Sequence, residues 1–139
     1  YRLLGNLMER LGEVKKDIAD EFDQAEQENE PEEIPPELRE RSEDERKAAV
    51  EAEYRFRRAG YLAALQGWLR DVWLAALRQG RELLHFQEWA DTSETVGHRL
   101  TPGQALENLQ SIEATQRLLE TTNVQEALAL EVGLLKLKF

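Results

Sequence analysis

Apolar residues recur every three or four positions along most of this 139-residue chain, which is the spacing of an amphipathic helix. The first such segment covers residues 1–29. Its apolar positions largely stop after Phe22, so we expect its second half to face solvent. Three prolines then interrupt the pattern between residues 30 and 36, and this stretch is predicted to form a turn or short linker.

A second helix is predicted to begin at Ser42, because Ser42 and Glu45 have the spacing of a capping box. We expect it to run to Gly80, since glycine readily adopts the left-handed conformation that ends many helices. This helix is charged up to Arg58. Beyond it lies an apolar stripe wide enough to face a core, made of Tyr61, Leu62, Leu65, Trp68, Leu69, Val72, Trp73, Ala76 and Leu77.

Trp68 and Trp73 are five residues apart and therefore lie on different parts of the helix surface. We expect one of them to pack in the core and the other to contact the next segment. A nucleic-acid stacking platform is disfavoured, because Asp71 offsets the nearby arginines.

The last third of the chain carries two further start signals. Thr101 and Gln104, with a proline between them, predict a helix start. Asn123 and Glu126 have the same spacing and predict the cap of a final helix within residues 123–139. A shorter polar helical stretch is expected at 91–100.

The final helix is apolar nearly all round, unlike a surface helix. We therefore expect it to be buried on most sides. Its apolar circumference is predicted to serve mainly the core of the domain, with some faces left for neighbouring proteins.

Composition supports an all-α fold, since Ala, Leu, Glu, Gln and Arg dominate and β-branched residues are few. The length suits a single helical domain over residues 1–139. Within it, residues 17–53 form an acidic stretch that we interpret as a helical arm or hairpin. Because the chain begins with Tyr rather than Met, we expect it to be a C-terminal piece of a longer protein.

The net charge of −10 is concentrated in that arm, which contains sixteen acidic residues and four basic ones. We therefore expect no direct contact with nucleic acid. No apolar run approaches the roughly 20 residues of a membrane-spanning helix, so no membrane association is expected. The absence of cysteine fits a reducing compartment, and a cytoplasmic location is predicted.

The sequence shows no candidate catalytic, cofactor-binding or metal-binding residues, and we expect no enzymatic activity. Glu94 and His98 share a helix face, yet a metal site would need two more ligands that the sequence does not nominate. Phosphate-binding loops, dinucleotide fingerprints and nucleophile elbows are absent. The many carboxylates lie among like charges, without the pocket that a general acid requires.

Two motifs together resemble a known family. The first is Trp-x-Arg-Asp at residues 68–71, and the second is Asn-Val-x-x-x-Leu-Ala-Leu-Glu-x-x-Leu-Leu-Lys-Leu at residues 123–137. This pattern resembles the C-terminal collar domain of bacterial DNA polymerase III clamp-loader subunits, most of all the delta-prime type. The resemblance covers about residues 46–139 and does not extend to the proline-rich turn.

The resemblance implies a five- or six-helix bundle that joins other clamp-loader subunits in the collar of the complex that loads the sliding clamp during DNA replication. The domain would contribute oligomerisation rather than chemistry and would bind no cofactor. Alternatives are the collar of the gamma/tau subunit and a stand-alone helical adaptor that binds a partner helix. The candidate core or interface residues are Trp68, Leu69, Val72, Trp73, Asn123, Leu128, Leu130, Leu134, Leu135 and Leu137.

Overall fold

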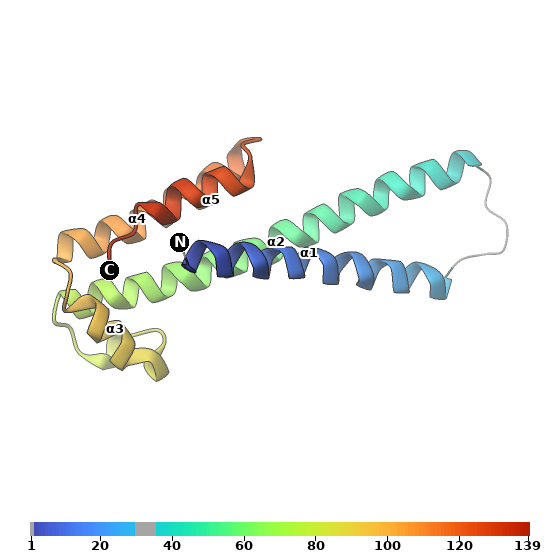
Figure 1. The fold of residues 1–139 in the computed structure, drawn as a ribbon. Coiled ribbons are helices and arrows are strands. Elements are labelled where there is room, and N and C mark those ends of the chain that lie inside the picture. The colour runs from blue at the N-terminus through green and yellow to red at the C-terminus, as the bar shows by residue number, and fades with distance from the viewer. Residues whose placement is uncertain (1, 30–35) are drawn as a thin grey trace. The chain divides into compact units, whose positions relative to one another are not determined.

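The computed structural model describes residues 2–29 and 36–139, and this part of the chain is all-α without strands (Figure 1). Its helices are α1 (Arg2–Asn29), α2 (Pro36–Ala76), α3 (Ala90–Gly97), α4 (Pro102–Thr121) and α5 (Glu126–Leu135). Two short 3-10 turns, η1 (Arg81–Leu83) and η2 (Gln87–Trp89), lie between α2 and α3. The predicted all-α class is confirmed. None of the described helices is long and apolar enough to cross a membrane.

The chain divides into two compact units. One unit is Gly5–Ala59, and the other is Gly60–Phe139 together with the first four residues. The boundary falls within α2, so the first part of this helix belongs to one unit and the remainder to the other.

In the Gly5–Ala59 unit, α1 and the first part of α2 are antiparallel and joined by ion pairs (Figure 1). Arg57 binds Glu21 at 2.7 Å, while Arg46 binds Asp23 and lies 3.7 Å from Glu26. As residue numbers increase along α1, the numbers of their ion-pair partners decrease along α2, which is the order expected in the predicted hairpin. These side chains are partly exposed to solvent, which screens their charges, so each pair stabilises the unit only slightly.

Among the residues of this unit whose burial is described, only a few are buried. Leu11, Val14 and Ile18 are buried and share one face of α1 by their spacing. On α2, Tyr54 is buried, with the Lys15 ammonium 5.1 Å and the Arg58 guanidinium 5.8 Å from its ring centre. The two cations thus bind an aromatic face rather than only carboxylates.

The start of α2 differs from the prediction. The helix begins at Pro36, so Ser42 lies inside it instead of capping it. Proline suits the first turn of a helix, because its fixed φ is helical and no N–H is required there. The rest of the predicted proline-rich turn, residues 30–35, lies outside the described residues.

The end of α2 also corrects the sequence interpretation. Gly80 has φ −68° and precedes η1, whereas Arg78 adopts the left-handed conformation with φ 59°. The Arg78 amide donates to the Ala75 carbonyl at 2.9 Å and the Gln79 amide donates to the Leu74 carbonyl at 3.0 Å. This bond pair is the Schellman motif, with arginine at the position usually held by glycine.

The core of the Gly60–Phe139 unit forms where α2, α3 and α4 meet. Val72, Ala76 and Ala105 make a buried cluster, and partly buried Trp68 and Trp73 both pack against it. The two tryptophans therefore share one core, contrary to the expected division between core and next segment. Helix α3 approaches closely at Gly97, where a Cβ would lie 2.6 Å from the Val72 carbonyl oxygen and 2.9 Å from the Ala76 nitrogen.

Buried Asp71 fixes the segment between α2 and α3. Its carboxylate accepts hydrogen bonds from the backbone amides of His85 and Phe86, both at 2.8 Å. The Phe86 ring lies over Gly67, at which a Cβ would be only 3.1 Å from the ring. One buried carboxylate thus satisfies two loop amides that no helix could pair.

The start of α4 matches its prediction. The Gln104 amide donates to the Thr101 hydroxyl at 3.2 Å, and the Thr101 amide donates to the Gln104 side-chain oxygen at 3.0 Å. Both bonds of a capping box are therefore present, with Pro102 as the first helical residue.

The start of α5 does not match. The helix begins at Glu126 after Gln125, without a side-chain cap, and Asn123 is exposed in the connection. The Thr122 amide and hydroxyl both donate to the Leu118 carbonyl, at 3.1 and 2.6 Å, and so complete the end of α4. The chain then needs the next residues to reverse direction, which leaves Asn123 too far from the first turn of α5 to cap it.

Candidate protein-interaction surface

Helix α5 has two apolar faces, of which the described residues bury only one. The inner face, Ala129, Leu130, Gly133 and Leu134, is buried. Opposite it are Leu128, Val132 and Leu135, with exposed fractions of 56, 46 and 52%. We call these three residues the outer stripe. The expectation that α5 is buried on most sides, mainly in the core of its own domain, is therefore wrong within this chain.

The inner face fits closely against α4 because of a glycine. A Cβ at Gly133 would collide with the Thr115 hydroxyl and lie 3.0 Å from Thr115 Cβ. The Ser111 hydroxyl donates to the Gly133 carbonyl at 3.1 Å, and the Thr115 hydroxyl donates to the Ser111 carbonyl at 2.8 Å. The backbones approach closely here, and α5 has little freedom to rotate its outer stripe inward.

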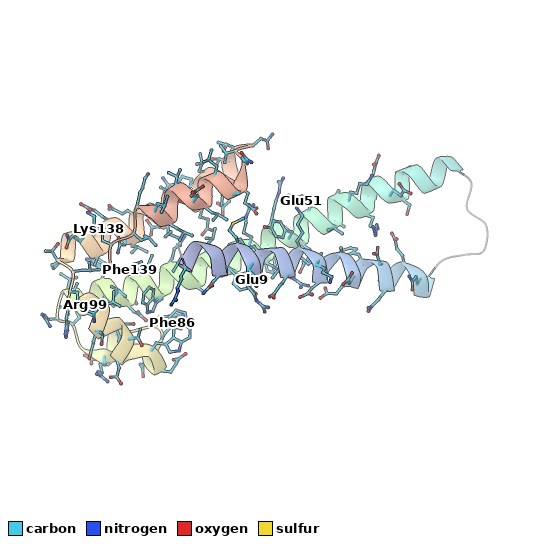
Figure 2. The ribbon with its side chains drawn as sticks, viewed as in Figure 1. Glu9, Glu51, Phe86, Arg99, Lys138 and Phe139 are labelled. Atoms are coloured by element: carbon cyan, nitrogen blue, oxygen red, sulfur yellow. The ribbon has the colours of Figure 1, made fainter. Side chains whose placement is uncertain are left out.

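The segment after α5 fastens the helix a second time. The buried Asn108 side chain donates to the Lys138 carbonyl at 2.6 Å and accepts from the Lys138 amide at 2.9 Å. The Lys138 ammonium lies 2.7 Å from a Glu107 oxygen, and the Phe139 ring centre is 6.0 Å from that of Trp68. Figure 2 labels Lys138 and Phe139 in this segment. The inner face is thus held to α4 at Gly133 and again just beyond the C-terminal end of α5.

A groove of about 270 Å³ lies between α4 and α5 beside the outer stripe. Its small residues are Thr115, Ala129 and Gly133, which bring the two helices together. Larger apolar side chains line the rest of it, namely Leu118, Val124, Leu128 and Val132. Leu118 and Val124 are each 40% exposed, so the groove and the outer stripe form one continuous apolar surface. We call it the α4–α5 surface.

Charge is nearly absent from the groove. Lys136 is the one charged residue among the described residues that line it. Among the described residues Lys136 makes no ion pair, whereas nearby Lys138 is paired with Glu107. The surface thus carries a single unpaired ammonium at the end where α5 finishes.

The structure distributes the predicted core or interface residues between core and surface. Leu69, Val72, Leu130 and Leu134 are buried, and Trp68, Trp73 and Leu137 are partly buried. Leu128 and Leu135 are exposed on the outer stripe, and Asn123 is exposed in the connection before α5. Residue type alone does not separate the buried from the exposed leucines.

Residues of this surface that were not among the predicted core or interface residues include Leu118, Val124, Val132 and Gly133. A spacing signal existed, because Val124, Leu128 and Val132 follow one another at four-residue intervals. A small residue inside a long apolar segment was also a sign of close helix packing. Neither signal identifies which helix is the neighbour.

A smaller aromatic patch lies before α3. Trp89 is 52% exposed and its ring stacks on Phe86, labelled in Figure 2, with ring centres 5.1 Å apart. Leu83 is 48% exposed nearby in sequence. This patch contains fewer apolar side chains than the α4–α5 surface and ranks second as an interaction site.

Glu94 and His98 belong to an ion-pair region. The Arg81 guanidinium bonds both oxygens of Glu94, at 2.8 and 2.6 Å, and Asp91 at 2.7 Å. Hydrogen bonding by Arg81 lowers the pKa of Glu94, with a smaller electrostatic contribution from His98. No group of three or more potential metal ligands occurs within residues 2–29 and 36–139. Glu94 is therefore an ion-pair partner of the Arg81 guanidinium.

Comparison with models of protein families, with curated proteins and with solved structures finds no match to this chain.

Proposed function

We propose that this chain is an assembly domain, which binds other protein subunits through the α4–α5 surface. The outer stripe is the observation that carries this proposal. Three large apolar side chains of one helix are about half exposed, although the same helix buries its opposite face. Contiguous exposed apolar surface of this kind marks sites where proteins associate.

The finer proposal is the collar of a bacterial clamp-loader subunit of the delta-prime type, acting in DNA replication with the other subunits as partners. Its support is the motif over residues 123–137, which supplies both faces of α5. The Trp-x-Arg-Asp motif adds Asp71, whose carboxylate positions the segment between α2 and α3. The gamma/tau collar is the runner-up within this family.

Assembly, rather than catalysis, is the role that these side chains suit. Two of the buried polar side chains, Asp71 and Asn108, are occupied by backbone partners. The hydrogen-bonding groups of these side chains hold the segment between α2 and α3 and the final segment in place. We therefore propose no cofactor and no reaction for this chain, and purified chain is expected not to hydrolyse ATP.

A binding experiment tests the assembly role. The chain is mixed with the other clamp-loader subunits of its source organism, and complexes are separated by size-exclusion chromatography. Leu128→Asp should prevent co-elution, because a carboxylate would have to be desolvated in the interface. Ala127→Asp is the matched control, since Ala127 is exposed on the same helix outside the outer stripe.

Equal co-elution of both variants would remove the α4–α5 surface from the interface. Failure of the unmodified chain to join clamp-loader subunits would refute the collar proposal. The adaptor alternative is favoured by the groove itself, and it predicts binding to a single partner helix without those subunits.

A further inference from the structure

We infer that the groove between α4 and α5 binds an amphipathic helix of a partner protein, whose carboxylate pairs with Lys136. This inference rests on the proposed assembly function and specifies the partner. It follows from the shape of the groove, from the residues that line it and from its single charge.

The shape favours a helix. The groove lies between two antiparallel helices, since Ser111 bonds to Gly133 while Asn108 bonds to Lys138. Helix α5 has ten residues and is about 15 Å long, or roughly three turns. A partner helix of about the same length can place apolar side chains three and four residues apart into such a groove.

The lining determines what those side chains must be. Leu118 and Leu128 are large and exposed, whereas Ala129 and Gly133 are small and buried between the helices. Apolar side chains of the partner would therefore enter over the small residues and contact the large ones. The opposite, polar face of the partner helix would stay in water.

The charge of Lys136 determines which residue type the partner helix carries at one end and where that end lies. Lys136 is the charged member of the lining and lies near Ser111, whereas Leu118, Val124 and Gln125 line the other end. A carboxylate at the matching end of the partner stripe would pair with Lys136. A lysine there would face like charge in a partly apolar setting, so this one residue favours acidic partners and fixes the orientation of the helix.

The test uses the full chain and two labelled helical peptides of about four turns. Both peptides carry leucine at every third or fourth position, and they differ by Glu or Lys at one end of the leucine stripe. Fluorescence anisotropy measures binding at low and high salt. We expect the Glu peptide to bind about threefold to tenfold more tightly at low salt, with a smaller ratio at high salt.

Variants of the chain locate the binding. Lys136→Glu should reverse the preference between the peptides, and Leu128→Gln should weaken both by about tenfold or more. Both residues are exposed, and tryptophan fluorescence checks that the variants remain folded. Val132→Gln is the second variant for the same contact.

Equal binding of the two peptides, or a preference that Lys136→Glu leaves unchanged, would overturn the inference. Peptide binding insensitive to Leu128→Gln and Val132→Gln would overturn it too. A dimer of the chain that Leu128→Gln abolishes in sedimentation would assign the groove to a second copy instead. If the peptides behave as expected but clamp-loader subunits do not bind, the collar proposal alone fails. If the subunits bind through the outer stripe but peptide charge is irrelevant, this inference alone fails.

Discussion

Truncation of two leucines on α5 distinguishes its inner face from its outer stripe. Leu130 is completely buried, whereas Leu128, two residues earlier, is 56% exposed. Leu130→Ala and Leu128→Ala remove the same atoms from the same helix. Their effects on the free energy of unfolding should therefore differ only through burial and packing.

The expected losses follow from these exposures. Leu130→Ala removes three buried carbons, worth roughly 2.4 kcal/mol at about 0.8 kcal/mol each. The cavity left behind raises the cost to about 3–4 kcal/mol. Leu128→Ala removes a side chain that is more than half exposed and leaves no closed cavity, so the cost should be about 1 kcal/mol or less.

Urea unfolding followed by tryptophan fluorescence measures both values. All three tryptophans, Trp68, Trp73 and Trp89, lie in the Gly60–Phe139 unit, so the signal reports on the unit that contains α5. Equal destabilisation by the two substitutions would refute the two-faced description of α5. So would a larger loss for Leu128→Ala.

Four further outcomes are expected. Gly133→Ala should destabilise the chain by about 1–3 kcal/mol, because its Cβ collides with α4; urea unfolding measures the loss. Arg78→Gly should stabilise the chain by about 1 kcal/mol, because Arg78 has φ 59° and glycine accepts this conformation without strain; the same unfolding assay detects the gain. Asp71→Ala should cost about 1–3 kcal/mol by removing the acceptor of the His85 and Phe86 backbone amides, and amide hydrogen exchange should become faster at both. Arg81→Met should raise the pKa of Glu94 toward its ordinary value of 4.5, which carboxyl carbon NMR titration follows.

The pH dependence of stability that arises from the Arg81–Glu94 pair has a defined sign. Since the folded-state pKa of Glu94 is lowered, its contribution to stability is present above the unfolded pKa. That contribution is lost as the pH falls through the folded pKa. A raised pKa in the unmodified chain would contradict the pairing with Arg81.

Each of the other substitutions has a control. Gly103→Ala adds the same methyl group where the nearest atom, Thr101 Oγ1, is 4.0 Å away, and it should not destabilise the chain. Gly80→Ala tests the alternative helix end: Gly80 has φ −68°, and its new Cβ would first meet the end of the exposed Glu82 side chain, which can move, so little change in stability is expected. Absence of the expected gain for Arg78→Gly would contradict the Schellman assignment. Uniformly faster exchange throughout the unit after Asp71→Ala would indicate global unfolding instead of a released loop.

Local interactions made much of the fold predictable. The start of α4 depends on Thr101, Pro102 and Gln104, which lie within one turn, so the sequence contains every atom of the cap. The buried positions Leu69 and Val72 follow from helical spacing in the same way. Each of these predictions needed contacts within a few residues only.

The helix boundaries that were predicted wrongly are positions at which two local signals compete. Gly80 was a reasonable helix end, yet the Schellman hydrogen bonds form two residues earlier and place Arg78 in the left-handed region. Asn123 has good capping chemistry, but the end of α4 and the reversal of the chain use the residues around it. Packing of the helices selects which signal is used, and a single sequence does not contain that selection.

The sequence alone determined that α5 is apolar on more than one face and therefore needs contacts on more than one side. Tertiary structure decided which face the chain itself covers. The decision depends on Thr115 and Gly133, whose small size lets α4 and α5 approach, and on Asn108, which holds the segment after α5. These contacts join residues about twenty to thirty positions apart, a distance at which helical spacing carries no information. They turn Leu130 inward and leave Leu128 in the outer stripe, where another protein can bind it.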